Sequence, residues 1–147
     1  VQYDVRRDEF YLMSGSSKQE FNLVAEGIRK MALLWQLVKN GALEKGAILF
    51  WDEPEANINP TYIPIIVEML LELQRRDVQI FISTHNYMIA NYFEVKKAME
   101  DSIVFHSLSF DNSTGVLQYE KSHRFADLKN NAIIAAFNKL LDDIYDM

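Results

Sequence analysis

The feature that most constrains the fold is the apolar run AILFW, residues 47–51, which ends in the adjacent carboxylates Asp52 and Glu53. A continuous apolar run of this length predicts a β-strand that is covered on both faces. The run VQIFIS, residues 78–83, predicts a second buried strand, and we expect a helix from about 61 to 76 between them. The order strand, helix, strand predicts a right-handed crossover that places the two strands parallel.

Shorter patterns predict the remaining elements. The segments EFYLM and QEFNLV flank the turn GSSK and predict a hairpin around Gly15. A broad apolar stripe at helical spacing predicts a deeply packed helix over residues 28–39, with Trp35 in the core. The helix after the first strand has two candidate caps: Asn59, which a proline follows, or Thr61, which has a proline in its first turn. The other expected elements are helices at about 87–99 and 127–146 and strands at 102–107 and 116–121.

The composition narrows the class of protein. The chain has 147 residues, enough for one compact domain, and a formal net charge of −6. That charge argues against a broad surface for nucleic acid or anionic membranes. The chain has no cysteine, which excludes disulfides and thiolate-metal sites and fits a cytoplasmic protein. No apolar run approaches the roughly 18 residues of a membrane span, so we expect no membrane partner.

The two predicted parallel strands end at one edge of their sheet. The first strand is followed by Asp52 and Glu53, and the second by Thr84, His85 and Asn86. Open α/β sheets bind ligands in the crevice outside the carboxyl ends of their strands. We therefore expect the two carboxylates and the imidazole to converge on one site.

An apolar strand that ends in Asp-Glu is the Walker B pattern. In this chemistry Asp52 holds Mg²⁺, which neutralises the phosphates of a nucleotide. Glu53 can orient or deprotonate the attacking water. His85 can donate a hydrogen bond to the γ-phosphate as its charge shifts in the transition state. The sequence thus predicts hydrolysis of a nucleoside triphosphate.

Four motifs in order resemble the ATPase domain of the ABC/SMC/RecF superfamily, and within it the bacterial AAA-family ATPases of the overcoming-lysogenization-defect and AbiEii kinds. The resemblance covers roughly residues 10–106. It implies an α/β P-loop NTPase lobe, a parallel sheet with flanking helices, that binds ATP and Mg²⁺. The motifs are LVAEGIRK (23–30, signature), ILFWDEP (48–54, Walker B), EANINP (55–60, D-loop) and FISTHN (81–86, switch histidine).

The resemblance also implies roles for residues outside Walker B. Gly27 would be the last glycine of the signature and would meet the γ-phosphate bound by the opposite subunit. Its place at the start of a predicted helix suits this role, because free N–H groups there favour phosphate. Asn57 and Asn59 would lie in the loop that crosses to the partner. Two signature residues depart from the family pattern: Ala25 replaces the usual serine, and Glu26 adds a negative charge. In the D-loop, Asn59 replaces the usual aspartate.

The phosphate-cradling motif GxxxxGK[ST] does not occur in the sequence. In this family that motif lies upstream of the signature. We therefore expect residues 1–147 to form a single lobe, the C-terminal half of an ATPase core, inactive without the upstream Walker A half of the same protein. The expected assembly is a homodimer of ATPase heads with nucleotide sandwiched between them, and DNA or an effector protein is a further candidate partner.

Two other functions remain open on the sequence. The chain could be a dimerisation or regulatory module that does not hydrolyse nucleotide, and the missing phosphate loop favours this. It could also be a metal-dependent nuclease, with Asp52, Glu53 and His85 as ligands. The C-terminal DDIYD resembles a metal cluster, but acidic residues at a chain end favour a solvated helix face.

Overall fold

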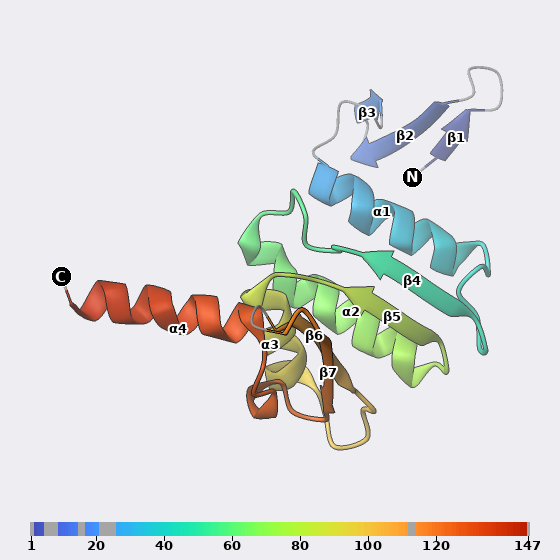
Figure 1. Ribbon diagram of the computed structural model, residues 1–147. Coiled ribbons are helices and arrows are strands. Elements are labelled where there is room, and N and C mark those ends of the chain that lie inside the picture. Colours follow the sequence, from blue (N-terminus) through green and yellow to red (C-terminus); the bar gives the residue numbers. More distant parts are fainter. Residues whose placement is uncertain (1, 5–8, 15–16, 21–25, 112–113, 147) are drawn as a thin grey trace. The chain divides into compact units, whose positions relative to one another are not determined.

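The computed structural model describes residues 2–4, 9–14, 17–20, 26–111 and 114–146. These residues belong to two compact units, which we call the first unit (Val1–Ser83) and the second unit (Thr84–Met147). Figure 1 shows the elements of both units. No helix among the described residues has the length and apolarity needed to cross a membrane.

The first unit begins with a small antiparallel sheet. Its strands β1 (Gln2–Asp4), β2 (Glu9–Ser14) and β3 (Ser17–Glu20) are ordered β1-β2-β3. Ser14 pairs with Ser17, so the predicted hairpin is confirmed. The second predicted strand continued to residue 24, but 21–25 lie outside the described residues, as does Gly15.

The strand-helix-strand unit predicted at the centre of the chain is confirmed. Strand β4 (Ile48–Asp52) lies parallel to β5 (Gln79–Ser83), with Ile48 opposite Gln79 and Asp52 opposite Ser83. A short 3₁₀ helix η2 (Pro60–Tyr62) and helix α2 (Ile63–Arg75) connect them (Figure 1). Asn59 caps η2: its side-chain oxygen accepts a hydrogen bond from the Thr61 N–H at 3.0 Å, with Pro60 at the first helical position. The N-cap residue of α2 itself is Tyr62, which makes no side-chain capping hydrogen bond.

Apolar residues of α2 recur at the spacing of one helical face, so the helix buries a continuous stripe. That stripe comprises Ile63, Ile66, Val67, Leu70 and Leu71. A second cluster joins α2 to α1 (Glu26–Lys39) and to one face of the sheet. The members of this cluster are Leu34, Leu43, Leu73 and Val78, against which Leu49, Trp51 and Ile80 pack.

The prediction that β4 is covered on both faces is wrong. Successive side chains of a strand point to opposite faces. Leu49 and Trp51 point to the core, but Phe50 remains 73% exposed and Phe81 of β5 46% exposed. Their rings stack on each other, with centroids 4.9 Å apart and planes 9° from parallel. The core of the first unit therefore covers one face of the β4–β5 pair, and the other face, here called the open face, carries the exposed rings of Phe50 and Phe81.

Helix α1 is also less buried than predicted. Its buried residues are Gly27 and Leu34, whereas Leu33 is 55% and Trp35 46% exposed. Trp35 is therefore not a core residue; its ring lies under the Lys39 ammonium, 4.9 Å from the centroid. Apolar residues lie on both sides of this helix, so its apolar surface is wider than the face that the described residues bury.

The second unit combines two helices with an antiparallel hairpin. Its elements are α3 (Tyr87–Lys96), β6 (Phe105–Phe110), β7 (Leu117–Ser122), the 3₁₀ helix η3 (Phe125–Asp127) and α4 (Ala132–Tyr145). The strand expected at 102–107 is shifted toward the C-terminus, and the last helix begins five residues later than expected at Ala132, after η3. Asn131 sets that start, because its side chain accepts hydrogen bonds from the N–H groups of Ile133 and Ile134.

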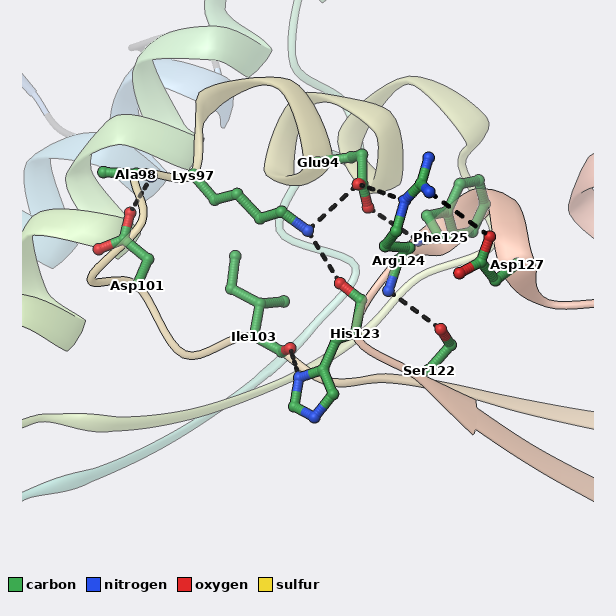
Figure 2. A network of polar contacts seen from close by, with 10 residues as sticks. All are labelled: Glu94, Lys97, Ala98, Asp101, Ile103, Ser122, His123, Arg124, Phe125 and Asp127. Atoms are coloured by element: carbon green, nitrogen blue, oxygen red, sulfur yellow. Dashed lines mark hydrogen bonds and ion pairs between the residues drawn. The ribbon is translucent and has the colours of Figure 1, made fainter.

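A polar network fastens the end of α3 to η3 (Figure 2). The Glu94 carboxylate accepts hydrogen bonds from the Phe125 N–H at 2.8 Å and from Lys97 Nζ at 3.1 Å. Lys97 also donates to the His123 carbonyl at 2.8 Å. Burial, the largest single influence, raises the pKa of Glu94, but these hydrogen bonds and the charges of Lys97 and Arg124 together lower it below its ordinary value.

Candidate nucleotide site at the end of the parallel strands

Asp52 and Ser83 are the last paired residues of the two parallel strands. The Ser83 hydroxyl donates a hydrogen bond to Asp52 Oδ1, so the carboxylate is held at the strand end. The Glu53 N–H donates to the Ser83 carbonyl at 2.9 Å, which extends the pairing by one step. Asp52 and Ser83 therefore lie side by side at one edge of the sheet, as expected for the ends of these two strands.

The chain turns sharply at Glu53. Its φ of +45° lies in the left-handed region, which costs a residue with a side chain roughly 1–2 kcal/mol. The Ala56 N–H donates to the Glu53 carbonyl at 3.0 Å and closes a turn, and Pro54 within the turn is fully buried. The strand therefore ends at Asp52 because the packed turn sets the backbone of Glu53.

Residues 53–59, here named the post-strand loop, continue from this turn. Glu55 and Ile58 are buried, while Asn57 adopts a φ of +59°, a conformation that asparagine tolerates well. Asn59 ends the loop as the cap of η2, and its side-chain oxygen also accepts from the Thr61 hydroxyl at 2.8 Å. Asn59 thus has a local structural role, beside the partner-facing role that the family resemblance implies.

The N-terminus of α1 lies against the post-strand loop. Glu26 accepts a hydrogen bond from Asn57 Nδ2 at 2.8 Å. A Cβ on Gly27 would be 3.1 Å from Ile58 Cγ1 and 3.3 Å from Ile58 Cα, closer than side chains normally pack. Three residues predicted for the site, Glu26, Gly27 and Asn57, are therefore brought together. Ala25 lies outside the described residues.

Lys30 is a member of this cluster that the sequence reasoning missed. Its ammonium donates to the Glu53 carbonyl at 3.1 Å and to the Ala56 carbonyl at 2.8 Å. One helical turn separates Lys30 from Glu26, so both face the loop. The spacing of four residues in the sequence indicates that Lys30 and Glu26 share one helix face. It does not reveal that Lys30 binds backbone carbonyls.

His85 lies in the link between β5 and α3, at the start of the second unit. The Asn86 N–H donates to Thr84 Oγ1 at 3.0 Å, and Asn86 Oδ1 accepts from the Met88 N–H at 2.8 Å. Asn86 therefore caps α3 and fixes the backbone on either side of His85. That His85 shares a site with Asp52 and Glu53 stays a prediction.

The oxygen atoms at the strand end are suitable ligands for Mg²⁺. Mg²⁺ takes oxygen ligands and is usually bound by one or two carboxylates together with the phosphates of its substrate. Asp52, next to the Ser83 hydroxyl, offers such oxygens. Among the described residues no three His, Asp or Glu side chains are grouped to hold a metal by themselves. The acidic residues at the C-terminal end, Asp142, Asp143 and Asp146, are solvent-exposed.

The fold defines the class of protein. One solved structure is similar to this chain with a TM-score of 0.55 and 11% identity, over 90% of this chain and 68% of the other. It comes from "Structural biochemistry of ATP-driven dimerization and DNA stimulated activation of SMC ATPases". The chain therefore has the α/β fold of the P-loop ATPases of ABC/SMC type.

The family follows from the sequence match. Residues 7–91 match the family described as "AAA domain, putative AbiEii toxin, Type IV TA system". This match spans more than half of the chain, and the chain belongs to this family of nucleotide-binding ATPase domains. No curated protein matches the chain significantly.

Proposed function

We propose that this chain supplies the water-activating edge of an ABC/SMC-like ATPase head. The observation that carries the proposal is the Asp52–Ser83 pair at the carboxyl ends of two parallel strands, with Glu53 directly after it, in a chain of the AAA family. Asp52 would hold Mg²⁺, Glu53 would be the general base and His85 would contact the γ-phosphate. His85 follows Ser83 by two residues along the chain, which supports its place in this set.

The chemistry is hydrolysis of ATP by water. Bound Mg²⁺ neutralises charge on the phosphate oxygens. Glu53 takes a proton from water as its oxygen attacks the γ-phosphorus, and the bond from phosphorus to the β,γ-bridging oxygen breaks to leave ADP. A hydrogen bond from His85 stabilises the charge on the transferred group. Glu53 suits the task because the turn at φ +45° fixes its backbone next to Asp52.

The phosphate-cradling loop would come from a lobe outside these 147 residues. The sequence has no GxxxxGK[ST] motif, and the open face of β4–β5 carries the exposed rings of Phe50 and Phe81. Parallel strands are normally covered on both faces. A lobe that bears the phosphate loop would cover this face, and we call the chain together with that lobe the complete ATPase.

Two such heads would form a homodimer around ATP. The α1 start and the post-strand loop contact each other through Gly27 and Ile58, which supports one continuous surface for a partner head. Gly27 would meet the partner's γ-phosphate, with Ala25 and Glu26 beside it, and Asn57 and Asn59 would lie along the contact. The SMC structure similar to this chain is described in terms of ATP-driven dimerization. The head would work in the cytoplasm, on DNA or on an effector protein.

The test is Glu53→Gln in the complete ATPase. Gln keeps the shape of Glu53 but cannot take a proton, so turnover should fall at least about 100-fold. Affinity for ATP should remain within a few-fold of the unchanged protein. The control is Glu44→Gln, which alters the same side chain at an exposed position and should leave turnover unchanged.

Near-normal turnover in Glu53→Gln would contradict the role of Glu53. Failure of the unchanged complete ATPase to bind ATP at all would instead favour the non-hydrolysing dimerisation module. Hydrolysis of phosphodiesters that depends on Asp52 without ATP would favour the nuclease.

A further inference from the structure

Lys30 makes contacts that neither the Walker B strand nor the signature glycine explains. The Lys30 side chain is partly buried between α1 and the post-strand loop. Its ammonium joins two carbonyls of one turn, those of Glu53 and Ala56. An ammonium offers three donors, so both bonds can form at once. The same Glu53 carbonyl also accepts the Ala56 N–H, so the cation closes the turn from outside.

The backbone of Glu53 needs such support. A residue with a side chain is held at φ +45° only where its surroundings determine the conformation. The buried ring of Pro54 fixes the turn on one side. The Lys30 ammonium fixes the carbonyl of Glu53 itself, and charge-assisted hydrogen bonds are about twice as strong as neutral ones.

Helix α1 presents Lys30 on the face that also carries Glu26 and Gly27. Three residues of this face touch the loop at three points: Glu26 at Asn57, Gly27 at Ile58, and Lys30 at the turn. The helix start and the turn are therefore held in one fixed relation. A displacement of α1 would be transmitted to the backbone of Glu53 through these contacts.

We propose that Lys30 is a positioning residue, which holds the Glu53 backbone in the conformation that water activation requires and links it to the phosphate-facing start of α1. This inference rests on the proposed ATPase function. Lys30 contacts two carbonyls of the loop, and its effect on the reaction passes through Glu53. Loss of the ammonium should lower kcat and leave nucleotide affinity nearly unchanged, because Lys30 bonds the loop carbonyls and the loop that cradles the phosphates would come from the other lobe.

The experiment uses the complete ATPase with Lys30→Met, which keeps the aliphatic stem and removes the ammonium. Lys30→Arg keeps a cation with several donors and should restore part of the function. The matched control is Lys39→Met on the same helix, whose ammonium lies over Trp35. Two quantities are measured: amide hydrogen exchange of residues 53–59 without nucleotide, and kcat together with the dissociation constant of ATP.

In Lys30→Met the exchange of the Ala56 and Ile58 amides should rise about tenfold, because the bonds from these amides to Glu53 and Glu55 close the turn. At the same time kcat should fall at least tenfold, and the ATP dissociation constant should change less than threefold. In Lys30→Arg both the exchange rate and kcat should lie between those of Lys30→Met and those of the unchanged protein. Lys39→Met should match the unchanged protein.

Unchanged exchange in Lys30→Met would overturn the proposal, since the loop would then not depend on Lys30. Faster exchange with unchanged kcat would also overturn it, while leaving the proposed ATPase function intact. No turnover in the unchanged complete ATPase would instead refute the proposed function, and the exchange measurement would still decide whether Lys30 fastens the loop.

Discussion

The carboxylate of Glu94 offers the sharpest test of how the second unit is held together. Its two oxygens have separate donors: Oε2 accepts the Phe125 N–H at 2.8 Å, and Oε1 accepts Lys97 Nζ at 3.1 Å. In Glu94→Gln one oxygen becomes an NH₂ group, which donates and cannot accept. Whichever way the amide turns, either the Phe125 N–H or the Lys97 ammonium then faces another donor.

The magnitude follows from the number of bonds lost. Leaving a buried donor without an acceptor costs about 1–3 kcal/mol, and Phe125 is only 4% exposed. Arg124 adds little, since its side chain is 65% exposed and its Nε lies 3.8 Å from the carboxylate. We expect a loss of about 2 kcal/mol in the free energy of unfolding, which corresponds to a fall in Tm of about 4–8 °C for a chain of this size.

The loss should depend on pH with a defined sign. The pKa of Glu94 is lower in the folded protein than in the unfolded chain, so its contribution to stability is complete above the unfolded pKa of about 4.3. It disappears as the pH falls through the lower, folded pKa. Below that value the protonated carboxyl, like the amide of Gln, presents a donor on one side. The stability difference between the two proteins should therefore shrink toward zero in acid.

Unfolding should be followed by circular dichroism, together with hydrogen exchange at the Phe125 amide. Tryptophan fluorescence is unsuitable, since Trp35 and Trp51 both belong to the first unit. The control is Glu100→Gln, which makes the same change of charge at an exposed position. The reasoning is refuted if Glu94→Gln is as stable as this control at pH 7, or if its deficit is the same at pH 3 as at pH 7.

Two further predictions concern the first unit. Ile66→Ala removes a side chain with 0% exposure and should cost about 2–5 kcal/mol in denaturant unfolding, whereas Ile65→Ala, at 45% exposure on the same helix, should cost less than about 1 kcal/mol; equal losses would show that the α2 core is placed wrongly. Gly27→Ala should cost about 1 kcal/mol of stability, because a Cβ there crowds Ile58 and the second residue of a helix gains little from the helix propensity of alanine. ATP turnover of the complete ATPase should fall at least about tenfold; unchanged turnover would argue against a tight contact at this glycine.

Local patterns in the sequence correctly predicted the parallel strands and the position of a helix cap. The apolar runs at 47–51 and 78–83 predicted two strands, and the helix expected between them predicted that the strands are parallel. Of the two caps that the sequence offered, Asn59 and Thr61, Asn59 is the one observed, at the start of η2. Capping is a local event that involves neighbours in sequence, so it can be read from the letters alone.

The contacts that define the candidate site could not be read in the same way. The Lys30 ammonium binds two backbone carbonyls, and carbonyls are identical at every residue of the sequence. The left-handed backbone of Glu53 is equally hidden, because glutamate rarely adopts it and nothing local demands it. Both features exist because α1 packs against the post-strand loop. The two are distant in the sequence: Lys30 and Glu53, which share a hydrogen bond, are 23 residues apart.

The failed prediction of a fully covered β4 has a physical meaning of its own. Ile48, Phe50 and Phe81 are 55%, 73% and 46% exposed, equivalent to nearly two whole apolar side chains in water. Covering them would contribute about 3–5 kcal/mol, a large part of the stability of an ordinary domain. The stacking of Phe50 on Phe81 contributes only about 0.5–1.5 kcal/mol to the described core, less than covering the two rings would. The apolar pattern on both sides of β4 therefore fits the proposal that a further lobe covers this face in the complete ATPase.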